Sequence, residues 1–192
     1  MDVRHLVDLR YDDIHVRFIN DLCANIADGQ LRARPHGVNS VAWLIWHMTR
    51  VEDAVMSRFL AGRPQTLDEG DWNARMKLTR RDVGAGMTSA DVDALSETID
   101  LEALRSYQRA VSDRTRALIR DMPASAWDEI IAPDTVHRHA AADGMLVDAG
   151  RWVEEFWARG HSRAWYVLQV GLLHPYGHCF DAMVTRGLLG VS

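Results

Sequence analysis

Apolar residues recur three or four positions apart along four long segments of this 192-residue chain, a spacing that places them on one face of a helix. The four segments span residues 2–27, 40–61, 100–122 and 162–188. The sequence contains no strand alternation, hairpin turn or fixed-period repeat. It therefore predicts an all-α fold, a four-helix bundle in a single domain over residues 1–192, with two long connections that carry short helices.

The composition argues against several classes of function. Hydrophobic residues make up 47% of the chain and charged residues 26%, as in ordinary globular proteins. A net charge of -5 argues against nucleic-acid binding through a basic surface. Charges interrupt the chain from Asp2 onward, so no signal peptide is predicted, and no apolar run approaches the ~20 residues that span a bilayer.

These features predict a cytoplasmic protein that acts on a small molecule, with neither nucleic acid nor membrane as a partner. Its two cysteines, Cys23 and Cys179, lie far apart in the sequence and do not suggest a disulfide framework. An apolar stripe on the first or third helix could support a homodimer.

Two histidines stand four residues apart in the last predicted helix, within the sequence LHPYGHCFD. At ~100° of rotation per residue, His174 and His178 lie on one helical face, and Asp181 projects from that face too. Two imidazoles in this arrangement are the helical half of many zinc sites, although the glutamate of an H-E-x-x-H motif is missing here. His47, on an apolar stripe of the second helix, is the candidate third ligand. A lone histidine on such a stripe is more often a core residue, so that alternative stays open.

Pro175 follows His174 directly and cannot donate a hydrogen bond to the carbonyl of Gly171. We expect a kink at His174 with a widened helical turn, because a glycine at position 171 relieves part of the crowding. The alternative is a loop that joins two short helices. Cys179 should point away from the histidine face and pack in the interior.

The chain resembles the DinB-like family of four-helix-bundle proteins, in the branch that includes bacterial thiol-dependent S-transferases and mycothiol-dependent maleylpyruvate isomerases. The resemblance rests on residues 42–53 (AWLIWHMTRVED) and the following LAGRP, on HPYGH at 174–178, and on RGLLG at 186–190. It extends from about Met1 to Gly190, although the middle third matches only in its helical character.

The resemblance implies that His47, His174 and His178 bind a divalent metal, and three imidazoles suit zinc, nickel or iron. Many family members carry glutamate near the position of Asp181, which has a shorter side chain. We expect Asp181 either to orient one of the histidines or to act as a base. The resemblance also implies a low-molecular-weight thiol, since related proteins use mycothiol, bacillithiol or glutathione for S-transfer and isomerisation.

Three protein ligands would leave a metal with an open position, which is typical of catalytic sites. The first hypothesis is a metal-dependent thiol S-transferase. The second is a metal-dependent hydrolase that uses bound water. The third is a non-catalytic protein that binds metal or a small ligand, since a fold alone does not determine a function.

The sequence suggests roles for four further residues. Arg50 and Arg163 are candidate anchors for a substrate carboxylate. Trp43 shares the stripe of His47 and either lines a pocket or fills the core. His15 reads as a surface or capping residue.

Overall fold

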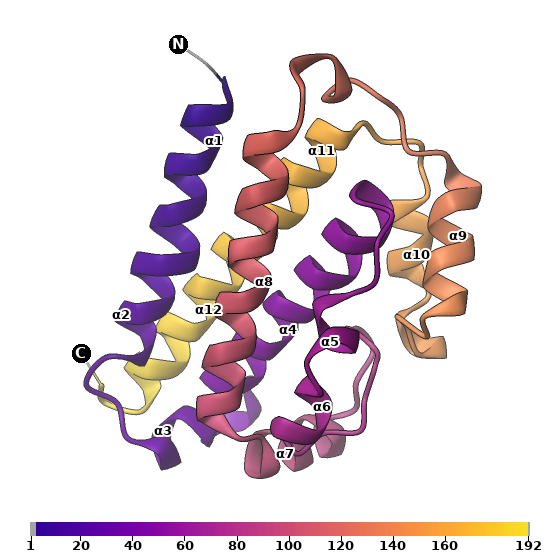
Figure 1. Cartoon of the computed structure of the whole chain (residues 1–192). Helices are drawn as coiled ribbons and strands as arrows, with labels where there is room; N and C mark the ends of the chain where they lie inside the picture. The colour runs from indigo at the N-terminus through magenta and orange to yellow at the C-terminus, as the bar shows by residue number, and fades with distance from the viewer. Residues whose placement is uncertain (1–2, 192) are drawn as a thin grey trace.

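Four long helical stretches form a bundle in the computed structural model, which describes residues 3–191 (Figure 1). α8 (Leu101–Asp121) packs against both the first stretch and α4 (Val41–Val55), and α12 (His174–Leu188) also packs against both of them. The described residues contain no strand, only an isolated bridge between Ile130 and Ser162. The predicted all-α bundle is therefore confirmed. The stretches are α1 (Val3–Asp12) to α2 (Ile19–Cys23), α4 (Val41–Val55), α8 (Leu101–Asp121), and α11 (Arg163–Leu168) to α12 (His174–Leu188).

Polar side chains begin three of the long stretches as the sequence predicts. Ser40, Asp100 and Ser162 each accept a hydrogen bond from a backbone N–H of the first turn of α4, α8 and α11, respectively. Such a cap satisfies a donor that has no partner inside the helix. The first stretch, in contrast, ends at Cys23 rather than at the predicted Ala27.

A contact from the far end of the chain explains that early end. The guanidinium of Arg186 donates to the carbonyls of Leu22 at 2.7 Å and Ala24 at 3.0 Å. Asn25 then takes a left-handed conformation, with φ of 53°. These carbonyls are satisfied without another helical turn, so local propensity does not decide where the stretch ends.

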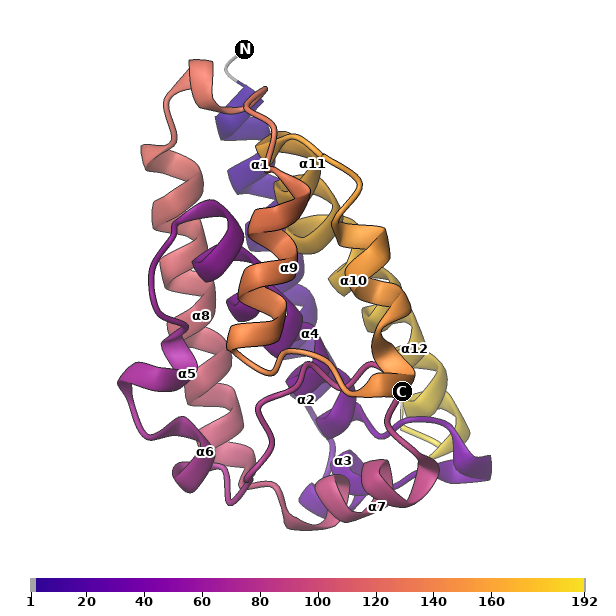
Figure 2. The same cartoon turned by 90° about the vertical axis from the view of Figure 1, so that its right-hand side faces the viewer.

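Two long connections carry short helices, and Figure 2 shows α9 and α10 side by side. None of the described helices has both the length and the apolar character required to traverse a bilayer. The first connection contains α5 (Thr66–Glu69), α6 (Trp72–Arg75) and α7 (Ser89–Thr98), and the second contains α9 (Pro133–Ala142) and α10 (Trp152–Trp157). The remaining short helix, α3 (Asp28–Arg32), leads from the first stretch toward α4.

A π-helical segment, Gln169–Leu173, directly precedes His174 and Pro175 in the last stretch. The widened turn that we predicted is therefore present, and the alternative of a loop between two helices is wrong. The carbonyl of Gly171, which a proline cannot serve, accepts a hydrogen bond from Nε2 of His15 at 2.9 Å. Two further π-helical segments, Asp13–Phe18 and Met56–Leu60, interrupt the first and second stretches.

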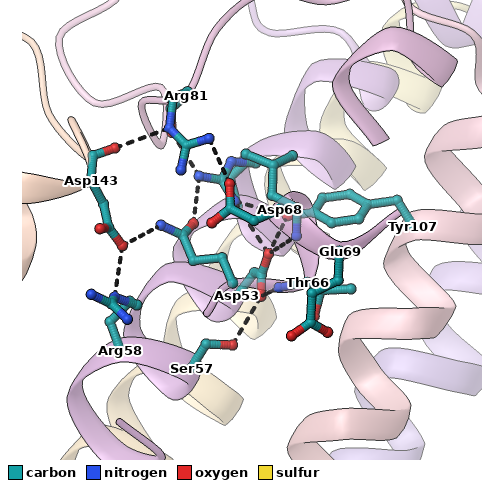
Figure 3. Close-up of polar contacts among 12 residues, drawn as sticks. Asp53, Ser57, Arg58, Thr66, Asp68, Glu69, Arg81, Tyr107 and Asp143 are labelled. Atoms are coloured by element: carbon teal, nitrogen blue, oxygen red, sulfur yellow. Dashed lines mark hydrogen bonds and ion pairs between the residues drawn. The ribbon is translucent and has the colours of Figure 1, made fainter. Parts of the chain in front are cut away.

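A buried carboxylate on α4 holds the first connection against the bundle (Figure 3). Asp53 accepts hydrogen bonds from Ser57 at 3.0 Å, from the backbone N–H of Thr66 at 2.7 Å, and from Tyr107 at 2.7 Å. The fully buried guanidinium of Arg50 lies 3.4 Å from the same carboxylate. One side chain thus joins α4, α5 and α8.

Replacing Asp53 with alanine should lower the free energy of unfolding by about 3–5 kcal/mol, because it leaves a buried guanidinium without its carboxylate. Urea unfolding at pH 7.5, followed by circular dichroism, measures the change. Asp148→Ala is the control, since that carboxylate is 94% exposed in its pair with Arg151, and its loss should cost under about 0.5 kcal/mol. Equal destabilisation by the two substitutions would contradict a central role for Asp53.

Candidate metal centre

The three histidines that the sequence selects meet in space. His47 lies on α4, and His174 and His178 lie on the first turns of α12. Each residue offers one ligand atom, and these atoms all lie within 4.8 Å of one another. The Nε2 atoms of His47 and His174 are 3.2 Å apart, which suits two ligands that each stand about 2.1 Å from one ion.

Outer hydrogen bonds orient two of the three rings. Nδ1 of His47 donates to the carbonyl of Val83 at 2.5 Å, and Nδ1 of His178 donates to Asp181 at 2.9 Å. A neutral imidazole that donates from Nδ1 keeps a lone pair on Nε2. The orienting contact predicted for Asp181 is present, whereas its side chain is 62% exposed and does not line the cavity described below.

Only one of the two ring nitrogens of His174 has a partner among the described residues. Its Nδ1 is buried and has no hydrogen-bond partner within residues 3–191. Its Nε2 faces Nε2 of His47, whose proton is already on Nδ1. Buried polar atoms without partners are rare. The facing Nε2 atoms share a hydrogen bond when His174 carries its proton on Nε2, and they present two lone pairs to a cation when that proton is on Nδ1.

Burial keeps two of these imidazoles neutral. Desolvation, with a contribution from the nearby His178, lowers the pKa of His47 to about 4. Desolvation also lowers the pKa of His174 well below its ordinary value, assisted by the neighbouring His47, His178 and His15. Because a metal binds imidazole only in its neutral form, both rings are ready to act as ligands at neutral pH.

The histidines lie at the wall of a cavity of about 450 Å³. Its other walls come from α4, from the π-helical segment before α12, from residues 83–87 of the first connection, and from α10. Trp43 both lines this cavity and packs in the core, since it is 6% exposed and stacks on His47 with ring centroids 4.8 Å apart. The two alternatives for Trp43 are therefore compatible.

Two glycines let the connections approach the site closely. A Cβ on Gly84, which has φ of +90°, would lie 2.7 Å from Trp46 and 3.1 Å from Nδ1 of His47. A Cβ on Gly86 would lie 2.6 Å from the backbone of Ala149 in the second connection. Only glycine fits such approaches, and Gly84 places the carbonyl of Val83 against His47.

Sequence reasoning missed these parts of the site. The carbonyl of Val83 carries no side-chain signal, and nothing in the spacing of Trp152, Val153 and Phe156 relates α10 to His47. The glycines at 84 and 86 were the only available indication, and by themselves they indicate a loop.

His15 is buried behind the site, so its assignment to the surface is wrong. It is 4% exposed, its ring stacks on Tyr11 with centroids 4.0 Å apart, and its Nδ1 lies 3.3 Å from a carboxylate oxygen of Glu52. Tyr11 donates a hydrogen bond to the same carboxylate. Through Nε2, His15 supports the carbonyl of Gly171, one turn before His174.

The two arginines that we considered as substrate anchors are engaged elsewhere. Arg50 is fully buried and donates to Tyr107, to Gln65 and to the carbonyl of Arg81. Arg163 donates to the carbonyl of Leu60 and to Glu129. Neither lines the cavity.

Cys179 packs in the interior, as expected. It is fully buried, and desolvation raises the pKa of its thiol to about 12. A thiol in that state is a poor nucleophile and a poor metal ligand.

Comparisons with known proteins agree with this fold. The family model described as the DinB superfamily matches residues 17–167, which include His47 but end before His174. A solved structure, described as a conserved protein from Enterococcus faecalis, has a TM-score of 0.74 and 17% sequence identity, with 99% of each chain covered. At that identity the likeness shows the fold alone. No curated protein matches the chain.

The pKa of His47 predicts how acid affects the metal-free protein. The unfolded chain binds a proton at this residue near pH 6.5, whereas the folded chain does so only near pH 4. The folded state is therefore destabilised as the pH falls below 6.5, by about 2 kcal/mol between pH 7.5 and pH 5.0 from His47 alone. His174 adds to this loss with the same sign.

Urea unfolding of metal-free wild type and His47→Gln at the two pH values measures this effect. The variant should lose less stability on acidification, by about 2 kcal/mol. His137, whose pKa is raised first by its hydrogen bond to Glu154, has the opposite dependence, but it is present in both proteins and cancels. The same pH dependence in both proteins would contradict a depressed pKa at His47.

Proposed function

The chain belongs to the DinB superfamily, and from that premise we propose that it is a metal-dependent enzyme of the thiol S-transferase type. The observation that carries the proposal is the cluster of His47, His174 and His178 beside an apolar cavity. The histidines would hold a metal and the thiol bound to it, and the apolar cavity would hold the substrate.

The three histidines would hold a divalent ion such as zinc, nickel or iron through their ring nitrogens. The fit rests on the facing Nε2 atoms of His47 and His174 and on the three ligand atoms, which all lie within 4.8 Å of one another. When bound, the ion would act as a Lewis acid that favours the ionised form of a thiol at its open position.

Residues of this chain would supply orientation and the exclusion of water. Val83 and Asp181 each hold a proton at Nδ1 of one histidine and so direct its Nε2 toward the other rings. The apolar walls would keep water from competing with a thiol for the electrophile. The imidazoles of His47 and His174, whose pKa values are lowered by burial, would remain unprotonated during this chemistry.

The cavity supports a thiol better than it supports hydrolysis. None of the described residues that line it is Asp or Glu, so no carboxylate faces the site as a base. Hydrolysis would therefore depend on the ion alone to ionise a water molecule, whose ordinary pKa is ~15.7. A thiol, with an ordinary pKa of ~8.5, depends on it much less.

The first test measures the metal. Protein purified without a histidine tag should contain about one divalent ion per chain, and His47→Ala, His174→Ala and His178→Ala should each lose most of it, because three imidazoles supply all the protein ligands. Elemental analysis and competition with a chelator measure content and affinity. His5→Ala, at an exposed position on α1, is the matched control and should behave as wild type.

Substitution of Asp181 should weaken metal binding less than substitution of any of the three histidines. Asp181→Asn should weaken metal affinity by about 10–100-fold, since it removes only the acceptor that orients His178. Equal metal content in wild type and all three histidine variants would refute the site.

The second test measures the reaction. Metal-loaded protein, mixed with monochlorobimane and with mycothiol, bacillithiol or glutathione in turn, should accelerate conjugation of one thiol above the uncatalysed rate. His174→Ala should abolish that acceleration while retaining a helical circular dichroism spectrum. Binding of metal and thiol without turnover would instead favour a non-catalytic binding protein, and turnover of esters without thiol would favour a hydrolase.

A further inference from the structure

We infer that the cavity beside the three histidines accepts an uncharged, apolar group of aromatic size and rejects a group that carries a carboxylate. The inference rests on the proposed function and concerns the part of the substrate that extends away from the atom held at the histidines. The lining of the cavity and the contacts of Arg50 support it.

The cavity wall is apolar apart from the histidines and two neutral amides. Of the eighteen described residues that line it, none is Asp, Glu, Lys or Arg, and the polar exceptions are the neutral amides of Asn39 and Gln169. A carboxylate that entered would lose its hydration and gain no ion pair from the wall. Desolvation without compensation on this scale lowers affinity by an order of magnitude or more.

The guanidinium of Arg50, next to the lining residue Val51 in the sequence, is committed to bonds elsewhere. Arg50 is fully buried, and its bonds to Tyr107, Gln65 and the carbonyl of Arg81 hold the first connection in place. Turning Arg50 toward the cavity would break all of these bonds. The packing of α4 thus keeps Arg50 out of the wall.

Aromatic side chains face the cavity from two sides. Trp43 lies on the bundle side, stacked on His47. Trp152 and Phe156, one turn apart on α10, lie on the other side. α10 is anchored by Trp157, which is 3% exposed and whose carbonyl accepts a hydrogen bond from Tyr166 at 2.6 Å.

Trp152 contributes apolar surface that is not covered by the chain itself. It lines the cavity and is nevertheless 68% exposed. An apolar ligand that covered this indole would remove a large area from water. The same contact would give nothing to a small polar thiol, so α10 is suited to select ligands by their apolar bulk.

The volume is sufficient for such a ligand. Small-molecule sites commonly measure about 300–1,000 Å³, and an apolar cavity of about 150 Å³ already binds benzene. A cavity of about 450 Å³ therefore has room for a sulfur atom at the histidines and an aromatic group beyond it.

Four thiols of similar size test the inference on full-length protein loaded with cobalt. Benzenethiol and methyl 4-mercaptobenzoate are uncharged beyond the sulfur, whereas 3-mercaptobenzoate and 4-mercaptobenzoate carry a carboxylate. Thiolate-to-cobalt absorption reports binding. Both uncharged thiols should bind at least tenfold more tightly than both carboxylates, because only the carboxylates lose hydration without a partner. Equal or tighter binding of the carboxylates would overturn the inference.

Variants on α10 give a matched comparison. Val153→Lys places a cation in the wall and should raise the affinity for 4-mercaptobenzoate at least tenfold. Glu155→Gln changes the net charge by the same amount at an exposed position on α10 outside the cavity and should leave the preference unchanged. Trp152→Ala should weaken benzenethiol several-fold while leaving 2-mercaptoethanol unaffected. A shared response of Val153→Lys and Glu155→Gln would overturn the inference.

A measurement on metal-free protein separates this inference from the proposed function. Saturation-transfer NMR should show binding of anisole but not of benzoate, with the anisole signal reduced in Trp152→Ala. That result, together with a failure to bind cobalt or any thiol, would refute the proposed function and support the apolar cavity. Binding of benzoate, or of neither compound, would overturn the inference about the cavity.

Discussion

The buried pair of Arg50 and Asp53 is the interaction on which the rest of the site depends. Asp53 fixes the start of the first connection through the backbone of Thr66, and Arg50 fixes its later part through the carbonyl of Arg81. Two residues further on, the carbonyl of Val83 meets His47. One helix, α4, thus carries both a metal-ligand candidate and the groups that place its orienting acceptor. The net contribution of such a pair to stability is small, because both charges must be desolvated. Removing one partner is nevertheless costly, because it leaves the other charge buried without compensation.

A second constraint acts on the other half of the site. A proline after His174 leaves the carbonyl of Gly171 without its usual donor, and the π-helical segment widens the turn. His15 supplies the missing donor from the first stretch. Its position is held in turn by Tyr11 and Glu52. The backbone that presents His174 is therefore supported by tertiary contacts rather than by helical bonds alone.

Burial of the histidines affects both their ability to bind a metal and the stability of the metal-free fold. Desolvation keeps His47 and His174 unprotonated at neutral pH, which is the state that a metal requires. The same desolvation makes the metal-free fold sensitive to mild acid. The cavity wall carries no charged side chain among the described residues, and the guanidinium of Arg50 stabilises the fold from inside it instead.

By itself the sequence determined the all-α class, the helix starts at Ser40, Asp100 and Ser162, and the common face of His174 and His178. These are local properties, since capping and helical rotation act within three or four residues. Tertiary structure alone decided that His47 joins that face, that His15 is buried, that the first stretch ends at Cys23, and that α10 walls the cavity. Each of these depends on groups far apart in the chain, whose meeting is governed by packing and by the need to satisfy buried polar atoms.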